Sequence, residues 1–352
     1  MKKSFLALAL MSAFSGAAFA QSSVTIYGIA DVGVQGLSAG AGKVAKIESG
    51  QESGSRIGFK GTEDLGDGLK ANFVLEQGIS MDTGASAQSR TFGRRSLVGL
   101  SGDFGAVNLG RDKTPTFQLF DNFDPFASGF INSGSGLSGI YYIGGKADTA
   151  VTNGANTRGR DGNSVFYYTP SNLGGFYGVG QYGAGEAAGD NSAGRALGLT
   201  VGFKAEGLDI AYNYVKDNAT STKMTNGIKA NTVAVNYDFG VAKPVFVYQK
   251  QSDDTGVSIK TFTLGVTVPV TPTGKVLATF TNVKNDTATA KGTVGTAKQF
   301  AIGYQYALSK RTDLYTAYAR TNQDANSTGF AGVASTAGAN INELTAGVRH
   351  QF

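Results

Sequence analysis

Hydrophobic and polar residues alternate along most of the chain. The stretch LDIAYNY at 208–214 has an apolar or aromatic residue at every second position, with Asp, Ala and Asn between them. The stretches TVAVNYDF at 232–239, TFTLGVTV at 261–268 and QFAIGYQY at 299–306 repeat the pattern. Such period-two alternation predicts β-strands with one apolar face and one small or polar face.

We expect sixteen such strands. In chain order, they lie near residues 23–36, 52–64, 69–79, 91–101, 105–112, 162–170, 175–184, 195–205, 208–217, 229–239, 242–251, 258–270, 274–284, 297–308, 312–321 and 341–352. No segment shows a sustained 3.6-residue apolar stripe, and the chain has 51 glycines, which helix interiors tolerate poorly. The sequence therefore predicts an all-β fold.

The connections between the expected strands are of two kinds. Those after the even-numbered strands are short and made of tight-turn residues, such as LGDG at 65–68 and TPTG at 271–274. Those after the odd-numbered strands have roughly ten residues or more and are rich in Gly, Ser, Thr, Asn and Asp. Short turns at one end and long loops at the other predict an antiparallel up-and-down meander.

An even-stranded meander with a continuous apolar face can close into a barrel, which removes its sheet edges. A barrel of about 16 strands is too wide for side chains to fill, so the polar face must line a water-filled lumen. The apolar face must then meet lipid, and strands of roughly ten residues have the length that crosses an outer membrane. We therefore predict a transmembrane β-barrel.

The last expected strand runs to the end of the chain. In INELTAGVRHQF at 341–352, Phe352 shares one face with Leu344 and Val348, and polar residues occupy the other. We expect this strand to pair with the first strand, SVTIYGIADV, and to close the cylinder. The ring of Phe352 would then lie in an aromatic girdle at the headgroup level.

The first twenty residues predict export. MKKSFLALALMSAFSGAAFA has two lysines, an apolar stretch and a small-x-small ending at Ala20. This order is typical of a secretory signal peptide (1–20) that leaves a mature domain at 21–352. A short membrane anchor is the alternative, but the apolar stretch is shorter than the ~20 residues of a spanning helix.

Composition argues against catalysis and against nucleic-acid binding. The chain has no cysteine and a single histidine, His350, so thiolate metal sites are excluded and most hydrolase chemistry would depend on one residue. Loss of Lys2 and Lys3 with the signal lowers the formal charge from +5 to +3, and the remaining charges are scattered. We expect no cofactor, no metal site and no nucleic-acid partner.

Several motifs together resemble the general porins of Gram-negative bacteria, near their β-proteobacterial branch. They are SSVTIYGIADVGV, SRIGFKGTEDLGDGLKANFVLEQG, TFGRRSLVGLSGDFGAVNLGR, RDGNSVFYYTPSNLGGF and the closing AGVRHQF. The resemblance implies a sixteen-stranded barrel in the outer membrane, usually a homotrimer, whose third long loop folds into the lumen as a constriction. It also implies that the outer-membrane assembly machinery reads the C-terminal aromatic strand.

The third long connection, 113–161, is the expected constriction loop. Loops of this length are functional or disordered. Its segment TFQLFDNFDPFASGF has aromatic anchors and two acids, Asp121 and Asp124, which we expect to face the lumen. The alternative is a solvated surface loop whose acids face water.

Basic residues are expected on the wall opposite these acids. Arg56 and Lys60 fall on the same face of their strand, and Ile57 and Phe59 fall on the other. We say that such residues have lumen parity, because a Lys or Arg facing lipid near the midplane would cost about 2–4 kcal/mol. Arg160 shares the parity of Ser164, and its spacing to NSV matches an arginine of the porin family.

For Arg94 and Arg111, alternation alone does not decide which face of the strand the side chain takes. Arg94 and Arg95 are adjacent, so one must point each way unless a bulge or a subunit interface intervenes, and the resemblance around FGR favours Arg94. Arg111 has the outward parity of Leu109 but ends its strand, so it is either a lumen residue or a rim residue. An excess of arginines over acids in a narrow pore predicts weak-to-moderate anion selectivity.

The sequence thus indicates a passive diffusion channel for small hydrophilic solutes and ions, with no catalysed reaction. The first alternative is a substrate-selective channel with a saturable site for sugars or dicarboxylates. A barrel enzyme with rim chemistry at His350 and a soluble adhesin or lectin are alternatives from other classes. Asp253 and Asp254 could hold a hard cation or lie in a solvated loop.

Overall fold

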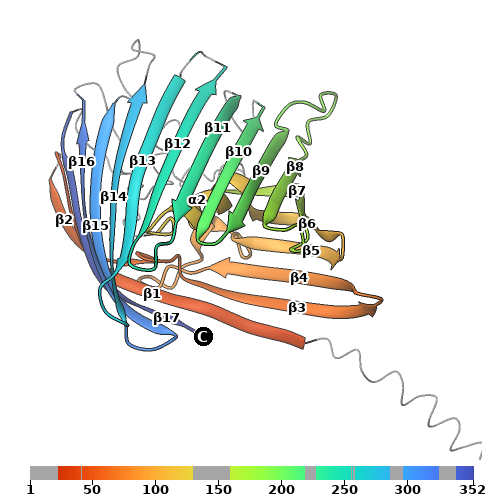
Figure 1. The fold of residues 1–352 in the computed structure, drawn as a ribbon, viewed down its shortest axis with the longest axis horizontal. Helices are drawn as coiled ribbons and strands as arrows, with labels where there is room; N and C mark the ends of the chain where they lie inside the picture. Colours follow the sequence, from red (N-terminus) through yellow and green to blue (C-terminus); the bar gives the residue numbers. More distant parts are fainter. Residues whose placement is uncertain are drawn as a thin grey trace, which may run out of the picture.

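The computed structural model describes residues 23–40, 42–129, 159–218, 227–254, 256, 258–285, 296–324 and 338–352. The expected signal peptide and most of the expected constriction loop lie outside these residues. In the described ranges, one antiparallel sheet of 17 strands curls until its first and last strands pair (Figure 1). No helix of these ranges is long and apolar enough to cross a membrane.

The strands follow one another along the chain, and consecutive strands are paired except β2 and β3, which both pair with β1. They are β1 (Ser23–Ala39), β2 (Lys43–Ser49), β3 (Arg56–Gly66), β4 (Leu69–Gly78), β5 (Arg95–Gly102), β6 (Gly105–Lys113), β7 (Arg160–Tyr168), β8 (Phe176–Gly183), β9 (Ala196–Ala205), β10 (Leu208–Asp217), β11 (Ile228–Tyr237), β12 (Lys243–Asp253), β13 (Ser258–Pro269), β14 (Gly274–Asn285), β15 (Ala297–Ala307), β16 (Thr312–Gln323) and β17 (Ile341–Gln351). Two short helical segments accompany them, η2 (Ala87–Ser89) and α2 (Pro115–Phe123).

The second predicted strand, 52–64, has the wrong start, because the observed strand β3 begins at Arg56. Residues 43–49, which were expected to form a loop, are the strand β2. Both β2 and β3 pair with β1, over Val32–Ser38 and Ser23–Ile29 respectively, so together they fill one place in the wall. Residues 50–55 leave the sheet between them. Because most β2 side chains are exposed on both faces, its sequence carries no apolar–polar alternation that could reveal a strand.

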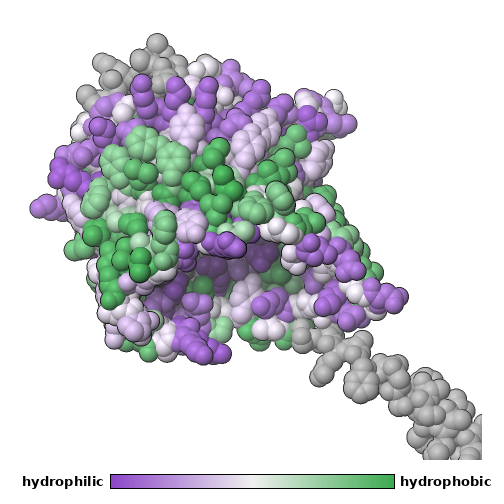
Figure 2. Space-filling view, viewed as in Figure 1, coloured by the Kyte–Doolittle hydropathy of each residue, from purple (hydrophilic) through white to green (hydrophobic). Residues whose placement is uncertain are grey.

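Alternate residues of the wall strands face opposite environments. In β11, Ala230, Thr232 and Ala234 are buried, whereas the intervening Asn231 and Val233 are exposed. Large exposed hydrophobic residues recur at the outward positions around the sheet. Figure 2 shows the result as a hydrophobic band on the outside and a hydrophilic interior visible through the opening. This arrangement suits a barrel with lipid outside and water inside.

The barrel closes through the C-terminus. β17 pairs with β1 from Ile29↔Gln351 to Ala39↔Ile341. One residue further, Gly28 N–H donates to the Phe352 carbonyl over 3.0 Å, and Phe352 N–H donates to the Gly28 carbonyl over 3.1 Å. The Phe352 ring covers Gly28, where any Cβ would overlap it.

Candidate functional site

A short helix inside the barrel begins the third long connection. α2 starts at Pro115, and the Thr114 hydroxyl caps it by accepting the Phe117 N–H over 3.2 Å. Its buried side chains Leu119, Phe120 and Phe123 pack on small lumen-facing residues of β10, β11 and β12. The sequence prediction missed this helix, although Thr116, Leu119, Phe120 and Phe123 have helical spacing and Thr-Pro is a helix-start signal.

After the helix, the chain passes β13 to reach the neighbouring strands β14, β15 and β16. Phe126 packs in a cluster with Leu277, Ala301, Tyr315, Ala317 and Ala319 of β14, β15 and β16. Glycines in the wall allow this contact, since a Cβ on Gly303 would lie 2.8 Å from the Phe126 ring and one on Gly265 would lie 2.8 Å from Pro125. The described first part of the loop therefore contacts the lumen wall twice, through α2 and through Phe126.

The wall facing the helix carries basic side chains that bind acids. Arg94 Nε lies 2.6 Å from Glu76 Oε1, with both side chains largely buried. Arg56 Nη1 lies 3.9 Å from the same oxygen and its Nε donates to the Gly54 carbonyl over 2.8 Å. The Tyr27 hydroxyl donates to the other Glu76 oxygen over 2.9 Å. Glu76 thus holds two arginines together, although nothing in its local sequence indicates this role.

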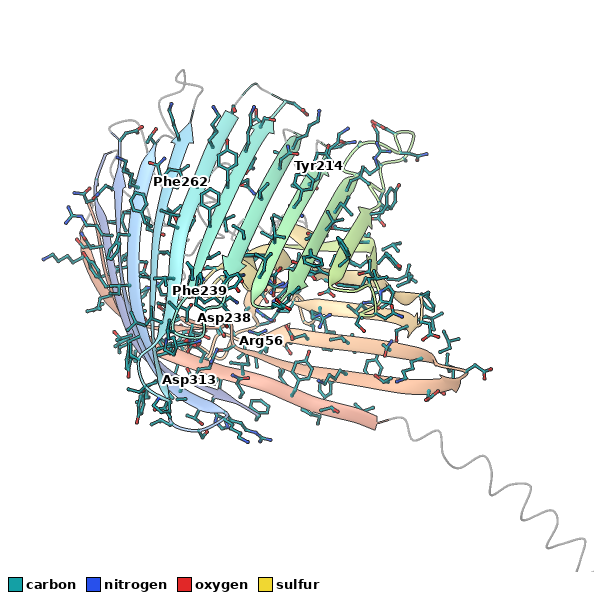
Figure 3. The ribbon with its side chains drawn as sticks, viewed as in Figure 1. Arg56, Tyr214, Asp238, Phe239, Phe262 and Asp313 are labelled. Atoms are coloured by element: carbon teal, nitrogen blue, oxygen red, sulfur yellow. The ribbon has the colours of Figure 1, made fainter. Side chains whose placement is uncertain are left out.

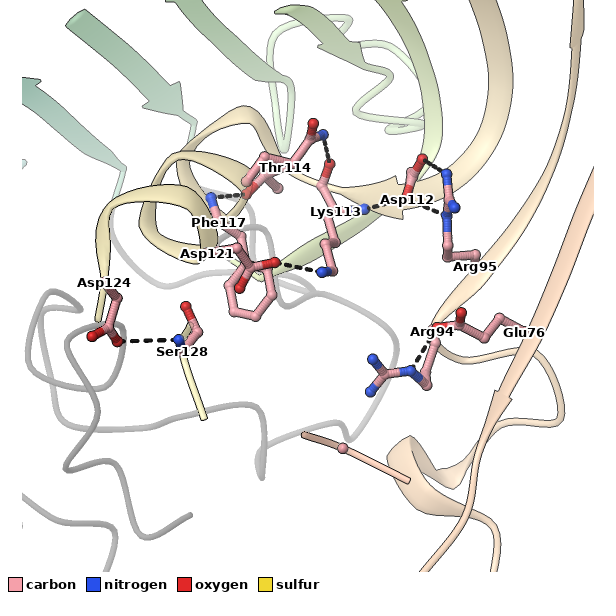
Figure 4. A network of polar contacts seen from close by, with 12 residues as sticks. Glu76, Arg94, Arg95, Asp112, Lys113, Thr114, Phe117, Asp121, Asp124 and Ser128 are labelled. Carbon is pink, nitrogen blue, oxygen red and sulfur yellow. Dashed lines mark hydrogen bonds and ion pairs between the residues drawn. The ribbon is translucent and has the colours of Figure 1, made fainter. Parts of the chain in front are cut away.

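Arg95 also faces the lumen. Its register partner is Glu76, so both side chains leave the sheet on the same side, and Arg94 precedes the first residue of β5, where alternation no longer applies. Arg95 binds the Asp112 carboxylate through Nε at 2.8 Å and Nη2 at 2.7 Å. Figure 4 shows both arginines with their acids. Arg95 was not predicted to face the lumen, because the two arginines were expected to lie within one strand, whereas β5 begins at Arg95.

Arg111 and Arg160 meet at the start of the loop. A register shift between Gly110 and Asp112 interrupts the alternation of β6, and Arg111 is buried instead of exposed on the outer face. Its Nε donates to the Gly93 carbonyl over 2.7 Å and its Nη1 to the Arg160 carbonyl over 3.4 Å. The Arg160 guanidinium lies 5.2 Å from the centre of the Phe117 ring, so it contacts α2 in the lumen.

Asp121 and Asp124, the two acids expected in the loop, have different partners. Asp121 forms an ion pair with Lys113, whose ammonium group also lies 5.4 Å from the centre of the Phe117 ring. The Asp124 carboxylate accepts the backbone N–H of Phe126 over 2.9 Å and that of Ser128 over 3.1 Å. It therefore stabilises the turn after α2 and lies away from Arg94 (Figure 4).

Lys60 lies apart from this cluster. Its register partner is Thr25, near the short-turn end of β1, and its ammonium group lies 5.3 Å from the centre of the Tyr27 ring. Its side chain is exposed. Lys60 therefore has lumen parity but forms none of the described ion pairs at the helix.

A second polar cluster surrounds residues 50–55, on β1, β16 and β17 beside the basic strands. Three consecutive backbone N–H groups of this turn donate to the Asp31 carboxylate, and the Tyr315 hydroxyl donates to it over 2.6 Å. Arg349 Nη1 lies 3.1 Å from Glu52 and its Nη2 lies 2.7 Å from Asp313. Burial, with the nearby Asp313, raises the pKa of Glu52 to about 9, which outweighs the opposite effect of Arg349.

The turn and the constriction loop touch each other. A Cβ on Gly129 would overlap the Glu52 carbonyl oxygen, and Glu52 also bonds Gln305 of β15. We call residues 50–55 the inward turn. It also reaches the basic wall formed by β3 to β7, because the Gly54 carbonyl accepts from Arg56 Nε and a Cβ on Gly54 would lie 2.6 Å from Arg94 Nη1.

The charges that lumen water reaches are mostly positive. In the two clusters, four ion-paired basic side chains and two ion-paired acidic ones are at least 12% exposed. The basic ones are Arg95 (33%), Lys113 (28%), Arg349 (20%) and Arg56 (16%), and the acidic ones are Asp121 (20%) and Asp313 (12%). Their partners Glu76, Asp112 and Glu52 are 2–6% exposed. Among the described residues of these two clusters, ions in the lumen therefore meet more accessible cations than accessible anions.

Chemistry beyond conduction has little support in the described ranges. They contain no group of three or more His, Cys, Asp or Glu side chains that could hold a metal ion. His350 lies at the barrel edge, where its Nδ1 is 2.9 Å from the Thr312 hydroxyl. A closed barrel with an apolar exterior, a polar interior and an inward loop defines a transmembrane β-barrel channel.

Comparison with known proteins agrees with this class. Residues 7–326 match the family model described as Gram-negative porin. The chain is 37% identical to outer membrane porin protein 32 of Delftia acidovorans and 31% identical to an outer membrane porin protein of Bordetella pertussis, in each case over 100% of both chains. It superimposes on the anion-selective porin from Comamonas acidovorans with a TM-score of 0.78 and 32% identity, over 94% of this chain and 100% of that one.

The chain belongs to the Gram-negative porin family. It is a passive channel of the outer membrane and not an enzyme, as the sequence predicted.

Proposed function

We propose that this porin is a general diffusion channel with weak-to-moderate anion selectivity, set by the basic wall of its lumen. The observation that carries the proposal is the excess of accessible basic side chains over accessible acids beside α2. Basic side chains lining a pore favour anion passage, and partial neutralisation by Glu76, Asp112 and Asp121 keeps the preference modest. The similar Comamonas porin is named anion-selective, which supports the same assignment here.

The contacts of each charged side chain indicate its role in the channel. Arg56, Arg95 and Lys113 present charge to passing ions, and Asp121 offsets part of it. Arg94, Arg111 and Arg160 are more buried and hold the wall and α2 in place while adding to the field. Asp124 shapes the loop, and Lys60 extends the positive lumen surface toward the short turns.

The test is a planar bilayer holding the purified protein under a potassium chloride gradient at low ionic strength. We expect stepwise conductance and a reversal potential that favours chloride, and the preference should weaken at high salt as charges are screened. A potassium-favouring potential at low salt contradicts the anion assignment. Saturable, competitively blocked sugar or dicarboxylate flux would instead indicate the substrate-selective alternative.

We propose further that the channel is a homotrimer and that the outer-membrane assembly machinery reads its C-terminal strand. Both proposals rest on family membership, and the second also rests on the position of Phe352 beside Gly28. Chemical cross-linking in isolated outer membranes should give a band at three times the monomer mass. A monomer band alone contradicts the trimer.

A further inference from the structure

The outer surface of β8 lacks side chains at two successive outward positions. Phe176 and Tyr182 are exposed on the lipid side of this strand, and Gly178 and Gly180 are the outward residues between them. The register agrees, because Gly178 pairs with Val201 of β9, whose side chain is exposed on the outer face. A Cβ on Gly180 would meet nothing within 4 Å. The hydrophobic band therefore has a gap in its side chains over β8.

The strands beside β8 continue the gap. Val201 pairs with Tyr212 of β10, and Tyr212 pairs in turn with Val233 of β11. All three side chains are exposed on the outer face. Val201 is much smaller than Tyr212, so it forms a low floor between β8 and the tyrosine.

Aromatic side chains bound the gap at the short-turn end. The rings of Phe176 and Phe203 lie 4.9 Å apart with their planes tilted by 56°. Leu173, from the turn between β7 and β8, is also exposed there. Tyr167, the register partner of Gly180, is directed away, because its hydroxyl donates to the Phe104 carbonyl at the next short turn over 2.9 Å.

Together these residues form a groove of about 570 Å³. We define the outer groove by its lipid-side residues Leu173, Phe176, Val201, Phe203, Ile210 and Tyr212. None of the described residues that line it is charged. Its volume lies in the range of about 300–1,000 Å³ that is usual for pockets that hold a small ligand.

The outer groove lies in the half of the wall that is nearer the short turns. Figure 3 shows Tyr214 toward the long-loop end and Phe239 at a short turn, and Ile210 and Tyr212 of β10 lie between these two levels. The groove is therefore continuous with the hydrophobic band that faces the hydrocarbon of the membrane.

The gap on β8 has the depth of one leaflet. From Phe176 to Tyr182 the strand rises about 20 Å, at roughly 3.3 Å per residue. With a strand tilt of about 45°, this length corresponds to about 14 Å along the membrane normal, close to half of the ~30 Å hydrocarbon core. A lipid chain of the leaflet nearer the short turns can therefore lie along the gap.

Retention of a chain here depends on packing. Lipid tails are as apolar as the groove, so the gain on binding comes from van der Waals contact with a concave surface. Each methylene in the groove meets side chains on several sides, whereas a methylene against a flat wall meets them on one side.

We propose that the outer groove binds one acyl chain of a membrane phospholipid from the leaflet nearer the short turns, whatever its headgroup. The ligand is a lipid because the groove opens only on the outer surface, within the hydrophobic band. The arginines of the lumen take no part in this site.

The test is native mass spectrometry of the full-length protein in neutral detergent, with phosphatidylethanolamine or phosphatidylglycerol of identical acyl chains. The native protein should retain one phospholipid per chain, and retention of the two lipids should agree within about twofold, since no charged side chain lines the groove. Val201→Phe places a ring on the floor of the groove and should reduce retention by roughly tenfold or more.

Two variants are controls. Val201→Ala deepens the groove and should retain the lipid. Val98→Phe adds the same ring at an exposed outward position of β5, outside the groove, and should also retain it. Unchanged single-channel conductance verifies that all three variants are folded.

Three results would overturn the proposal. They are a native protein that retains no phospholipid, equal retention in Val201→Phe and the native protein, and retention of phosphatidylglycerol alone. If Val201→Phe lowers the oligomer mass and Val98→Phe does not, the groove is a contact between copies of the chain and the lipid assignment is wrong.

Discussion

Arg94 and Glu76 form a short, buried ion pair in the lumen wall, with Nε and Oε1 2.6 Å apart. Arg56 and Tyr27 converge on the same carboxylate. One acid thus fixes two of the arginines that the sequence indicated as pore-lining. The pair links the stability of the wall to its charge, because loss of the acid weakens the structure and makes the lumen more positive.

Glu76→Gln should therefore change stability and selectivity in opposite directions. We expect a loss of about 3 kcal/mol in the free energy of unfolding, because a buried guanidinium loses its charged partner. The chloride preference of the folded channel should increase. Urea unfolding followed by circular dichroism and reversal potentials measure the two effects.

Glu63→Gln, on an exposed position of β3, is the control and should change both quantities little. A Glu76→Gln channel with native stability would show that the pair contributes nothing to the wall.

Gly129→Ala should release the constriction loop from the inward turn. The added methyl group overlaps the Glu52 carbonyl oxygen, so the loop end must move. We expect a larger single-channel conductance with more frequent fluctuations. Gly162→Ala is the matched control, since a Cβ there meets nothing within 4 Å. Equal conductance in the two variants would contradict the contact between loop and turn.

The raised pKa of Glu52 predicts a change in the channel at alkaline pH. With a pKa of about 9, the carboxyl is protonated at pH 7 and ionises as the pH rises toward 10. Ionisation adds negative charge beside Asp313 and Asp31, so it should lower chloride preference and weaken the docking of the inward turn. Because the folded state holds this proton and the unfolded state does not, the contribution to stability falls as pH rises from the ordinary glutamate range to about 9.

Glu52→Gln isolates this effect from the titration of lysines. The variant resembles the protonated acid, so it should match the native channel at pH 7 and exceed its chloride preference at pH 10. Native and variant channels that respond identically to pH would place the pKa of Glu52 outside this range.

Removal of Phe352 should impair assembly more than conduction. The deletion removes two backbone hydrogen bonds to Gly28 and uncovers this glycine at the closing seam. We expect several-fold less protein in the outer membrane, as measured by heat-modifiable mobility in gels, with normal conductance in the channels that do insert. Phe352→Tyr keeps the ring and the backbone and should insert normally. Equal insertion of the deletion variant would argue against a terminal assembly signal.

Most of the fold could be predicted from the alternation of apolar and polar residues. Sixteen segments were expected, and the wall strands from β4 to β17 begin and end within a few residues of them. Alternation is informative there because lipid selects one face and water the other. It failed at β2, which is exposed on both faces, and at α2, where a nine-residue helix lies within a long polar connection.

The candidate site was harder to predict, because parity holds only within a regular strand. Arg95 was missed because Arg94 lies before β5, and Arg111 could not be placed because a register shift follows Gly110. The partners Glu76 and Asp112 and the inward turn depend on contacts between distant segments. No local pattern could reveal that the Asp31 carboxylate would bind three amides of residues 51–53.

We propose above all that the accessible arginines of the basic wall set the ion preference of the channel. The reversal potential should therefore be measured at low ionic strength for the native channel, for Arg56→Ala/Arg95→Ala, and for the outward-facing control Arg320→Ala. We predict a chloride-favouring potential in the native channel and in Arg320→Ala, and a clear shift toward potassium in the double variant. An unchanged chloride preference in the double variant would contradict the account.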